Sequence, residues 1–140
     1  MSDVSSAEFA AEMLRLAQES PPFKAEACYD PDGDCIEFII RPDSFYARRL
    51  DELVTVYYSH ETNEITGSLI KGVAAFIRRL RAERPGARII IHEGRVKIEH
   101  ILLARLLTGP EELDELATLA YPKLIDAARA GDVEAELACV

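Results

Sequence analysis

The hydrophobic residues of the first twenty positions recur with the period of a helix. One face of this helix carries four of them, Phe9, Met13, Leu16 and Ala17. Ser5, followed three residues later by Glu8, forms a capping-box pattern at the start. Pro21 ends the pattern, because the residue before a proline is driven out of the α region. The sequence therefore predicts an amphipathic helix over residues 5–20.

After the prolines the alternation of apolar and polar residues changes to a period of two, which is typical of β-strands. The alternation flanks the sequence Tyr29-Asp30-Pro31-Asp32-Gly33-Asp34, whose proline presets φ at the first turn position. Gly33 accepts the positive φ that a three-residue loop requires. The pattern predicts a β-hairpin between residues 24 and 42.

The length of the hairpin loop sets the pairing of its strands. A three-residue loop pairs Tyr29 with Cys35, so that Cys28 lies on the opposite face from Cys35. The chain has three cysteines, an odd number, and it is long enough to build a core without disulfides. We therefore expect reduced thiols at Cys28, Cys35 and Cys139.

Two more strands are predicted over residues 53–60 and 65–73, where β-branched and aromatic residues are dense. The stretch at 43–52 before them fits either a helical turn or a crossing loop, and its pattern does not decide between the two. Together with the hairpin, these strands predict a sheet of about four to five strands.

The second half of the chain has mainly helical spacing. A helix is predicted over residues 73–83, ended by Pro85 and Gly86, and a short buried strand over 87–92. A second helix over residues 98–107 ends at Gly109.

One more helical region is predicted after Gly109. Thr108 is expected to cap it, with Pro110 in its first turn and Glu111 completing a capping box. Pro122 is expected to kink or divide it, which leaves a last helical stretch before Gly131.

These elements predict an α+β fold. An antiparallel β-meander is expected to pack against the N-terminal helix and several C-terminal helices. At 140 residues the chain has the size of one domain, so we expect residues 1–140 to form a single domain. The sequence has neither an apolar run of about 20 residues nor a signal-like N-terminus, which predicts a cytoplasmic protein.

The span from Tyr29 to Val73 resembles a family of small, uncharacterised bacterial proteins. That family is built on a Y-D-P-x-x-D hairpin, matched here by residues 29–34, and on a strand pair, matched by residues 51–56 and 64–70. The resemblance implies a β-meander. No activity is established for the family, so it implies no functional residue.

The net charge of −9 disfavours binding to nucleic acid and to anionic lipid. Residues 71–97 differ from the rest, because they contain eight basic residues and only two acidic ones. Arg78, Arg81 and Arg84 recur every three residues on the outside of the predicted helix. Such a stripe suits contacts with phosphates or with an acidic protein, although a solvated helix face has the same pattern. The candidate partner-binding residues are Lys71, Arg78, Arg81, Arg84 and Arg88.

Two groups of residues have the side chains that metal sites use. Asp30, Asp32 and Asp34 alternate as in a calcium loop, but the glycine and glutamate of an EF-hand are missing, so a hairpin tip is expected. The other group, His92, Glu93, Glu99 and His100, has imidazole and carboxylate ligands without the spacing of a known motif.

The sequence as a whole favours a small, non-catalytic protein-interaction module. Its partner is expected to be another protein or a second copy of the chain, with no cofactor, and no catalytic motif is found. Nucleic-acid binding through residues 71–97 is the alternative. A metal-dependent enzyme using His92, Glu93 and His100 is the second alternative.

Overall fold

The computed structural model describes residues 10–11, 23–84, 89, 91–109 and 113–137. The helix expected over residues 5–20 lies outside this part, except for Ala10 and Ala11, which are helical. Cys139, Arg88 and Pro110 also lie outside the described residues.

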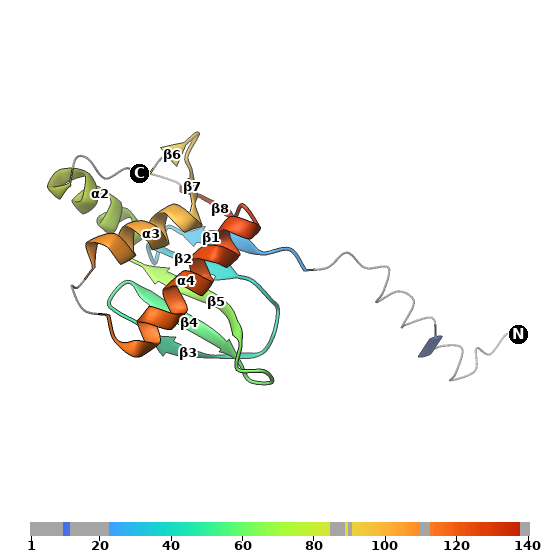
Figure 1. Cartoon of the computed structure of the whole chain (residues 1–140). Coiled ribbons are helices and arrows are strands. Elements are labelled where there is room, and N and C mark those ends of the chain that lie inside the picture. Colours follow the sequence, from blue (N-terminus) through green and yellow to red (C-terminus); the bar gives the residue numbers. More distant parts are fainter. Residues whose placement is uncertain (1–9, 12–22, 85–88, 90, 110–112, 138–140) are drawn as a thin grey trace, which may run out of the picture.

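A five-stranded antiparallel sheet forms one layer of the fold, so the predicted α+β class is confirmed (Figure 1). The strand order is β1-β2-β5-β4-β3. After β2 the chain crosses to the far edge of the sheet and returns through β3 and β4 to β5, which pairs with β2. The strands are β1 (Glu26–Asp30), β2 (Cys35–Ile39), β3 (Phe45–Arg49), β4 (Val54–Ser59) and β5 (Ile65–Lys71).

The edge strand β3 resolves the stretch that the sequence pattern left open. Four of its five residues are exposed, and two of them are arginines, so it lacks the alternation of a half-buried strand. Charged side chains on an edge strand also oppose pairing with further strands. Leu50 and Asp51 then form a turn by donating their N–H groups to the carbonyl of Val54.

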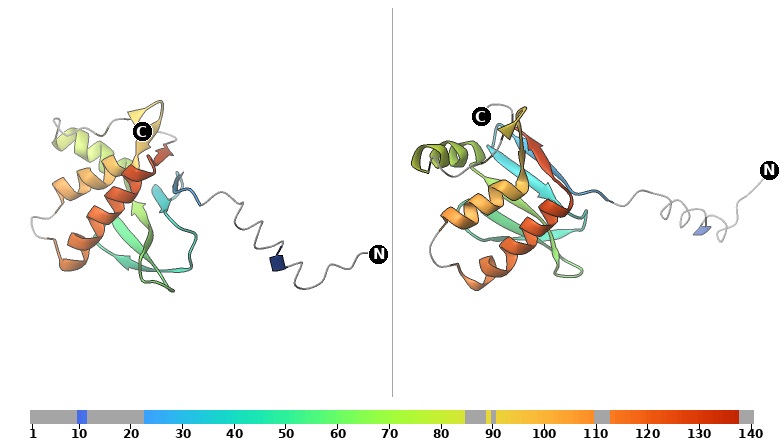
Figure 2. Two further views of the ribbon diagram at one scale, coloured as in Figure 1. Left: turned by 45° about the vertical axis from the view of Figure 1, so that its right-hand side comes forward. Right: turned by 45° about the horizontal axis from the view of Figure 1, so that its top comes forward.

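Helices form the second layer. Figure 2 shows that α3 and α4 lie across one face of the five-stranded sheet, with α2 beside α3. A small sheet, in the order β6-β7-β8, joins the start of α3 to the residues after α4. These elements are α2 (Val73–Glu83), β6 (Ile91–His92), β7 (Arg95–Lys97), α3 (Ile98–Thr108), α4 (Glu115–Ala130) and β8 (Glu134–Glu136).

The hydrophobic core lies between the two layers. The inward faces of β2, β4 and β5 contribute Ile36, Phe38, Val56 and Ile70, which are fully buried. The buried side chains of α2, α3 and α4 join them in one cluster. No helix in the described part of the chain is both long and apolar enough to cross a membrane.

The predicted register of the hairpin is wrong by one residue. Tyr29 pairs with Ile36, so that the loop contains four residues, and Asp34 rather than Gly33 has the positive φ, 50°. Cys28 and Cys35 therefore share one face, and both are free thiols. The cause is a contact far along the chain, because Asp34 binds the first turn of α2.

The predicted start and division of the last helix are also wrong. The Thr108 hydroxyl donates to the carbonyl of Ala104 inside α3, and Asp114 caps α4 by accepting the N–H of Ala117 at 2.7 Å. The helix continues through Pro122, which is exposed. The buried face continues on both sides of Pro122, through Ala117, Ala120, Tyr121, Leu124, Ile125 and Ala128, and its burial stabilises one undivided helix.

Candidate functional site

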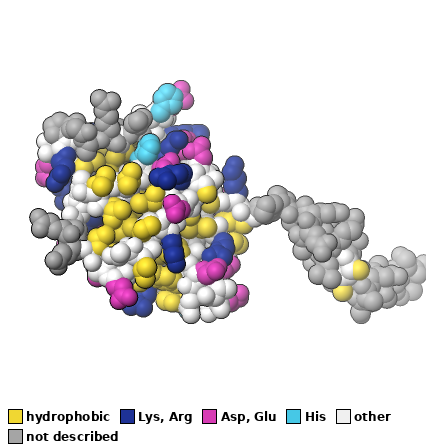
Figure 3. All heavy atoms as spheres, in the orientation of Figure 1, with side chains coloured by type: hydrophobic (Ala, Val, Ile, Leu, Met, Phe, Trp, Pro, Cys, Tyr) yellow, Lys and Arg dark blue, Asp and Glu magenta, His cyan; other side chains and the backbone are white. Residues whose placement is uncertain are grey.

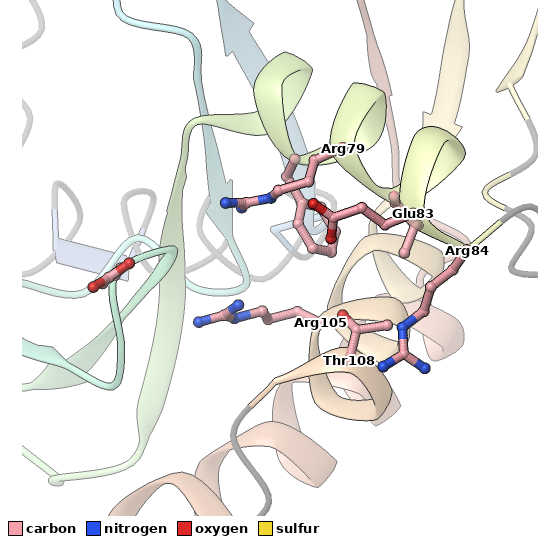
Figure 4. A pocket seen from close by; sticks show the side chains of 8 residues that line it. Arg79, Glu83, Arg84, Arg105 and Thr108 are labelled. Atoms are coloured by element: carbon pink, nitrogen blue, oxygen red, sulfur yellow. The ribbon is translucent and has the colours of Figure 1, made fainter.

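A groove of about 360 Å³ lies between α2 and α3 (Figure 4). Phe76 and Leu80 contribute the apolar part of its lining. The charged and polar side chains that line it are Glu52, Arg79, Glu83, Arg84, Arg105 and Thr108.

A second groove of about 440 Å³ adjoins the first and shares Glu52, Arg79 and Arg105 with it. It extends the charged surface past the start of α2 to Lys71 at the end of β5. Taken together, the two grooves bring four basic side chains and two acidic ones to one surface. We call this surface the arginine groove; its basic residues are Lys71, Arg79, Arg84 and Arg105.

The amphipathic character of α2 places its arginines at the groove. Phe76 and Leu80 are buried, and Arg79 and Glu83 follow them at three-residue spacing on the exposed flank. Arg84 is the C-cap residue, whose N–H donates to the carbonyl of Leu80 at 2.9 Å. In Figure 4 its guanidinium group turns away from α2 toward Thr108 on α3.

The hairpin between β1 and β2 holds the other end of α2. The Asp34 carboxylate accepts the N–H of Ala74 at 2.9 Å and that of Ala75 at 3.5 Å, while the Asp34 carbonyl accepts the N–H of Val73 at 3.1 Å. The hydroxyl of Tyr29 donates to the same carboxylate at 2.7 Å. Gly72, the N-cap by position, has no side chain to offer, so Asp34 caps the helix from another element.

The electrostatics of this cap follow from its contacts. Burial raises the pKa of Asp34, but the hydrogen bonds from Ala74, Tyr29 and Ala75 lower it by more, so that the pKa lies below its ordinary value. The hydrogen bond to Asp34, together with burial, raises the pKa of Tyr29 to about 12. Asp34 is therefore ionised and Tyr29 protonated at neutral pH.

A second aspartate holds Arg105 on α3. Arg105 Nε lies 3.3 Å from Asp51 Oδ2, and the two side chains are only 16% and 14% exposed. The other oxygen, Asp51 Oδ1, accepts the N–H groups of Leu53 and Val54, each at 2.8 Å. Tyr121 on α4 donates its hydroxyl to Asp51 Oδ2. One carboxylate thus joins a strand turn to both helices that cover the sheet.

The contacts of Asp51 also determine its charge state. Burial raises the pKa of Asp51, but hydrogen bonds from the Tyr121 hydroxyl and from Val54 and Leu53, with the charge of Arg105, lower it below its ordinary value. Burial and the bond to Asp51 raise the pKa of Tyr121 well above its ordinary range. The ion pair between Asp51 and Arg105 is therefore present at neutral pH.

The structure divides the five predicted partner-binding residues. Lys71 and Arg84 line the arginine groove. Arg78 and Arg81 are exposed on α2 but line neither part of it, and Arg78 lies close enough to Asp34 and Tyr29 for its charge to act on both. Arg88 is outside the described residues.

Sequence reasoning missed Arg79 and Arg105 as site residues. Arg79 does not belong to the series of Arg78, Arg81 and Arg84, which are spaced three residues apart. It lies three residues after the buried Phe76, however, and this spacing places it beside the apolar face of α2. Arg105 lies in a largely apolar helix and is the basic residue of its last turn, where it reads as a partner for the helix dipole.

The candidate metal ligands do not gather at one place. His92 belongs to β6 and His100 to α3, and Glu99 accepts a hydrogen bond from Arg129 Nε at 2.9 Å. Within the ranges that the structure describes, no three His, Cys, Asp or Glu side chains are placed to hold a metal. The aspartates of the hairpin serve backbone groups instead, since Asp30 accepts the N–H of Asp32 at 3.0 Å.

The chain was compared with protein-family models, curated proteins and solved structures. No protein-family model, no curated protein and no solved structure matches the chain. The resemblance of residues 29–73 to a bacterial family therefore stays a prediction, and the functional conclusion depends on the residues of the arginine groove.

Proposed function

We propose that the chain is a small, non-catalytic, cytoplasmic protein-interaction module, and that the arginine groove binds an acidic segment of a partner protein. The observation that carries the proposal is the convergence of basic side chains from three separate parts of the chain. Lys71 ends a strand, Arg79 and Arg84 belong to α2 and its cap, and Arg105 belongs to α3. Local sequence alone does not produce such a gathering.

The arrangement of the guanidinium groups supports carboxylate binding. In Figure 4 Arg79 and Arg105 extend in the same direction from the two facing helices. A guanidinium group binds a carboxylate through two parallel N–H donors, and two such groups side by side fit successive acidic side chains. Asp51 restrains Arg105 before any ligand arrives, which reduces the entropy lost on binding.

The acidic residues of the groove favour a protein ligand over a nucleic acid. Glu52 and Glu83 lie among the arginines and would repel a continuous phosphate backbone, as would the net charge of −9. A polypeptide can place a basic residue of its own beside them. Mixed charge of this kind provides specificity, because a wrong partner leaves unpaired or like charges in contact.

A peptide-binding experiment tests the proposal. A fluorescent peptide of alternating glutamate and glycine is titrated with the full chain at low salt, and its anisotropy gives Kd. Replacing both Arg79 and Arg84 by alanine is expected to weaken binding about 100-fold or more, since each charged hydrogen bond contributes about 1.5–3 kcal/mol and two are lost. Added salt is expected to weaken binding as well.

The matched control replaces Arg78 and Arg81, which lie on the same helix outside the groove. This double variant removes the same charge and is expected to retain most of the affinity. Equal losses in the two double variants would show that total charge, not the groove, determines binding. A single-stranded oligonucleotide that binds more tightly than the peptide, and depends on Arg78 and Arg81, would instead favour the nucleic-acid alternative.

A further inference from the structure

Exposed leucines gather on the two helices that cover the sheet. Five large apolar side chains are exposed in the described residues, and three of them lie on α3 or α4: Leu103 at 37%, Leu107 at 73% and Leu119 at 60%. Figure 3 shows apolar atoms concentrated over these two helices. Single exposed leucines are ordinary on a protein surface, but a group of them on adjacent helices marks an interaction surface.

The outer ridge of α4 carries an ordered set of side chains. Glu115, Leu119 and Lys123 follow one another at intervals of four residues, and all three are exposed. They lie on the side of the helix opposite Tyr121 and Leu124, which are buried. The ridge therefore has an acid one turn before the leucine and a base one turn after it.

Such a ridge is complementary to itself when it is reversed. If two copies of α4 cross antiparallel at Leu119, Glu115 of each copy faces Lys123 of the other. Parallel packing would place like charges together. The order of charges thus selects one arrangement, an isologous contact with two-fold symmetry.

We propose that a second copy of this chain docks on the α3–α4 face, with α4 antiparallel to its counterpart and Leu119 at the two-fold axis. The leucines of α3 extend the contact on the neighbouring helix. An unrelated apolar ligand would bury the leucines without any need for the order of Glu115 and Lys123. This face shares no residue with the arginine groove, so the inference goes beyond the proposed acidic ligand and does not depend on it.

Sedimentation equilibrium of the full chain over a range of concentrations, at low salt, tests the proposal. The wild type is expected to show a monomer–dimer equilibrium. Leu119→Glu places two like charges at the axis and is expected to raise the dimer dissociation constant about 100-fold. Phe23→Glu is the matched control, because Phe23 is similarly exposed but lies before β1, and it is expected to leave the constant unchanged.

A charge exchange separates this dimer from any other apolar contact. Glu115→Lys and Lys123→Glu are each expected to weaken the dimer about tenfold, because each creates two like-charge pairs across the axis. The double variant, with both substitutions, is expected to return to within about threefold of the wild type. Thermal unfolding of each variant shows that the monomer is still folded.

Three results would overturn the proposal. One is a wild-type monomer at every concentration. Another is a dimer that Leu119→Glu leaves intact. The third is a double charge variant weaker than both single variants, which would show that Glu115 and Lys123 do not face each other.

Discussion

Asp34 and Asp51 have similar surroundings but connect different parts of the fold. Each carboxylate accepts two backbone N–H groups and one tyrosine hydroxyl. Asp34 joins a hairpin to the first turn of α2, whereas Asp51 joins a strand turn to α3 and α4 and also pairs with Arg105. The direct ion pair with Arg105 makes Asp51 a centre that links three elements, whereas Asp34 serves as a helix cap.

The largest effect is expected from Asp51→Ala. This change leaves the mostly buried guanidinium of Arg105 without its partner and removes the acceptor for Tyr121 and for two backbone N–H groups. The free energy of unfolding is expected to fall by about 3 kcal/mol, as measured by urea denaturation. A loss no larger than that of Asp34→Ala would contradict the difference between the two sites.

Asp34→Ala is expected to have the second largest effect. It removes the only side-chain cap seen at the start of α2 in the described residues, and the loss is expected to be about 1–2 kcal/mol. Asp34→Asn retains an acceptor oxygen and is expected to lose less. Hydrogen exchange should show faster exchange at Ala74 and Ala75 than in the wild type, and unchanged exchange there would argue against the cap.

The two aspartates are also expected to differ in how they make stability depend on pH. The pKa of each aspartate lies below its ordinary value of 3.8 in the folded chain. Each group therefore contributes stability that is fully present above that value and is lost as the pH falls through the lower folded pKa. Asp51→Asn is expected to flatten the acid limb of the stability curve more than Asp34→Asn, because Arg105 favours ionised Asp51. Denaturation curves taken at intervals from pH 6 down to pH 2 measure both effects.

The smallest effects are expected from the two tyrosines. Tyr121→Phe removes a hydroxyl donor in a fully packed position, and a loss of about 1–1.5 kcal/mol is expected. Tyr29→Phe removes the corresponding donor near the surface and is expected to lose about 0.5 kcal/mol. Thermal unfolding of both variants gives the order, and the reverse order would show that the hairpin contact is the stronger one.

The sequence predicted the fold where a local pattern reports burial. Alternation identifies β2 because one of its faces is buried, and helical spacing identifies α2 and α3 for the same reason. Dense β-branched and aromatic residues identify β4 and β5, which are buried or half-buried along nearly all of their length. β3 was not predicted as a strand because it is an exposed edge strand without alternation. β7 and β8 were not predicted because three residues are too few to show a period. The register of the hairpin was predicted wrongly because Asp34 accepts a hydrogen bond from Ala74 of α2, which is 40 residues away along the chain.

The site was less predictable than the fold. Asp51 contacts Arg105 and Tyr121, which are 54 and 70 residues away along the chain. A local spacing of residues cannot predict contacts between such distant positions. The basic segment directed attention to α2, and two of its selected residues, Lys71 and Arg84, do line the arginine groove. The opposite wall came from Arg105, whose role depends on how α3 packs beside α2.

The binding of an acidic segment in the arginine groove is tested most directly by nuclear magnetic resonance of the arginine side chains. The Nε–H signals of the full chain are followed while the glutamate–glycine peptide is added at low salt. We expect the signals of Arg79, Arg84 and Arg105 to shift together and saturate with one Kd, while those of Arg78 and Arg81 barely move. Shifts confined to Arg78 and Arg81, or no shift at saturating peptide, would contradict it.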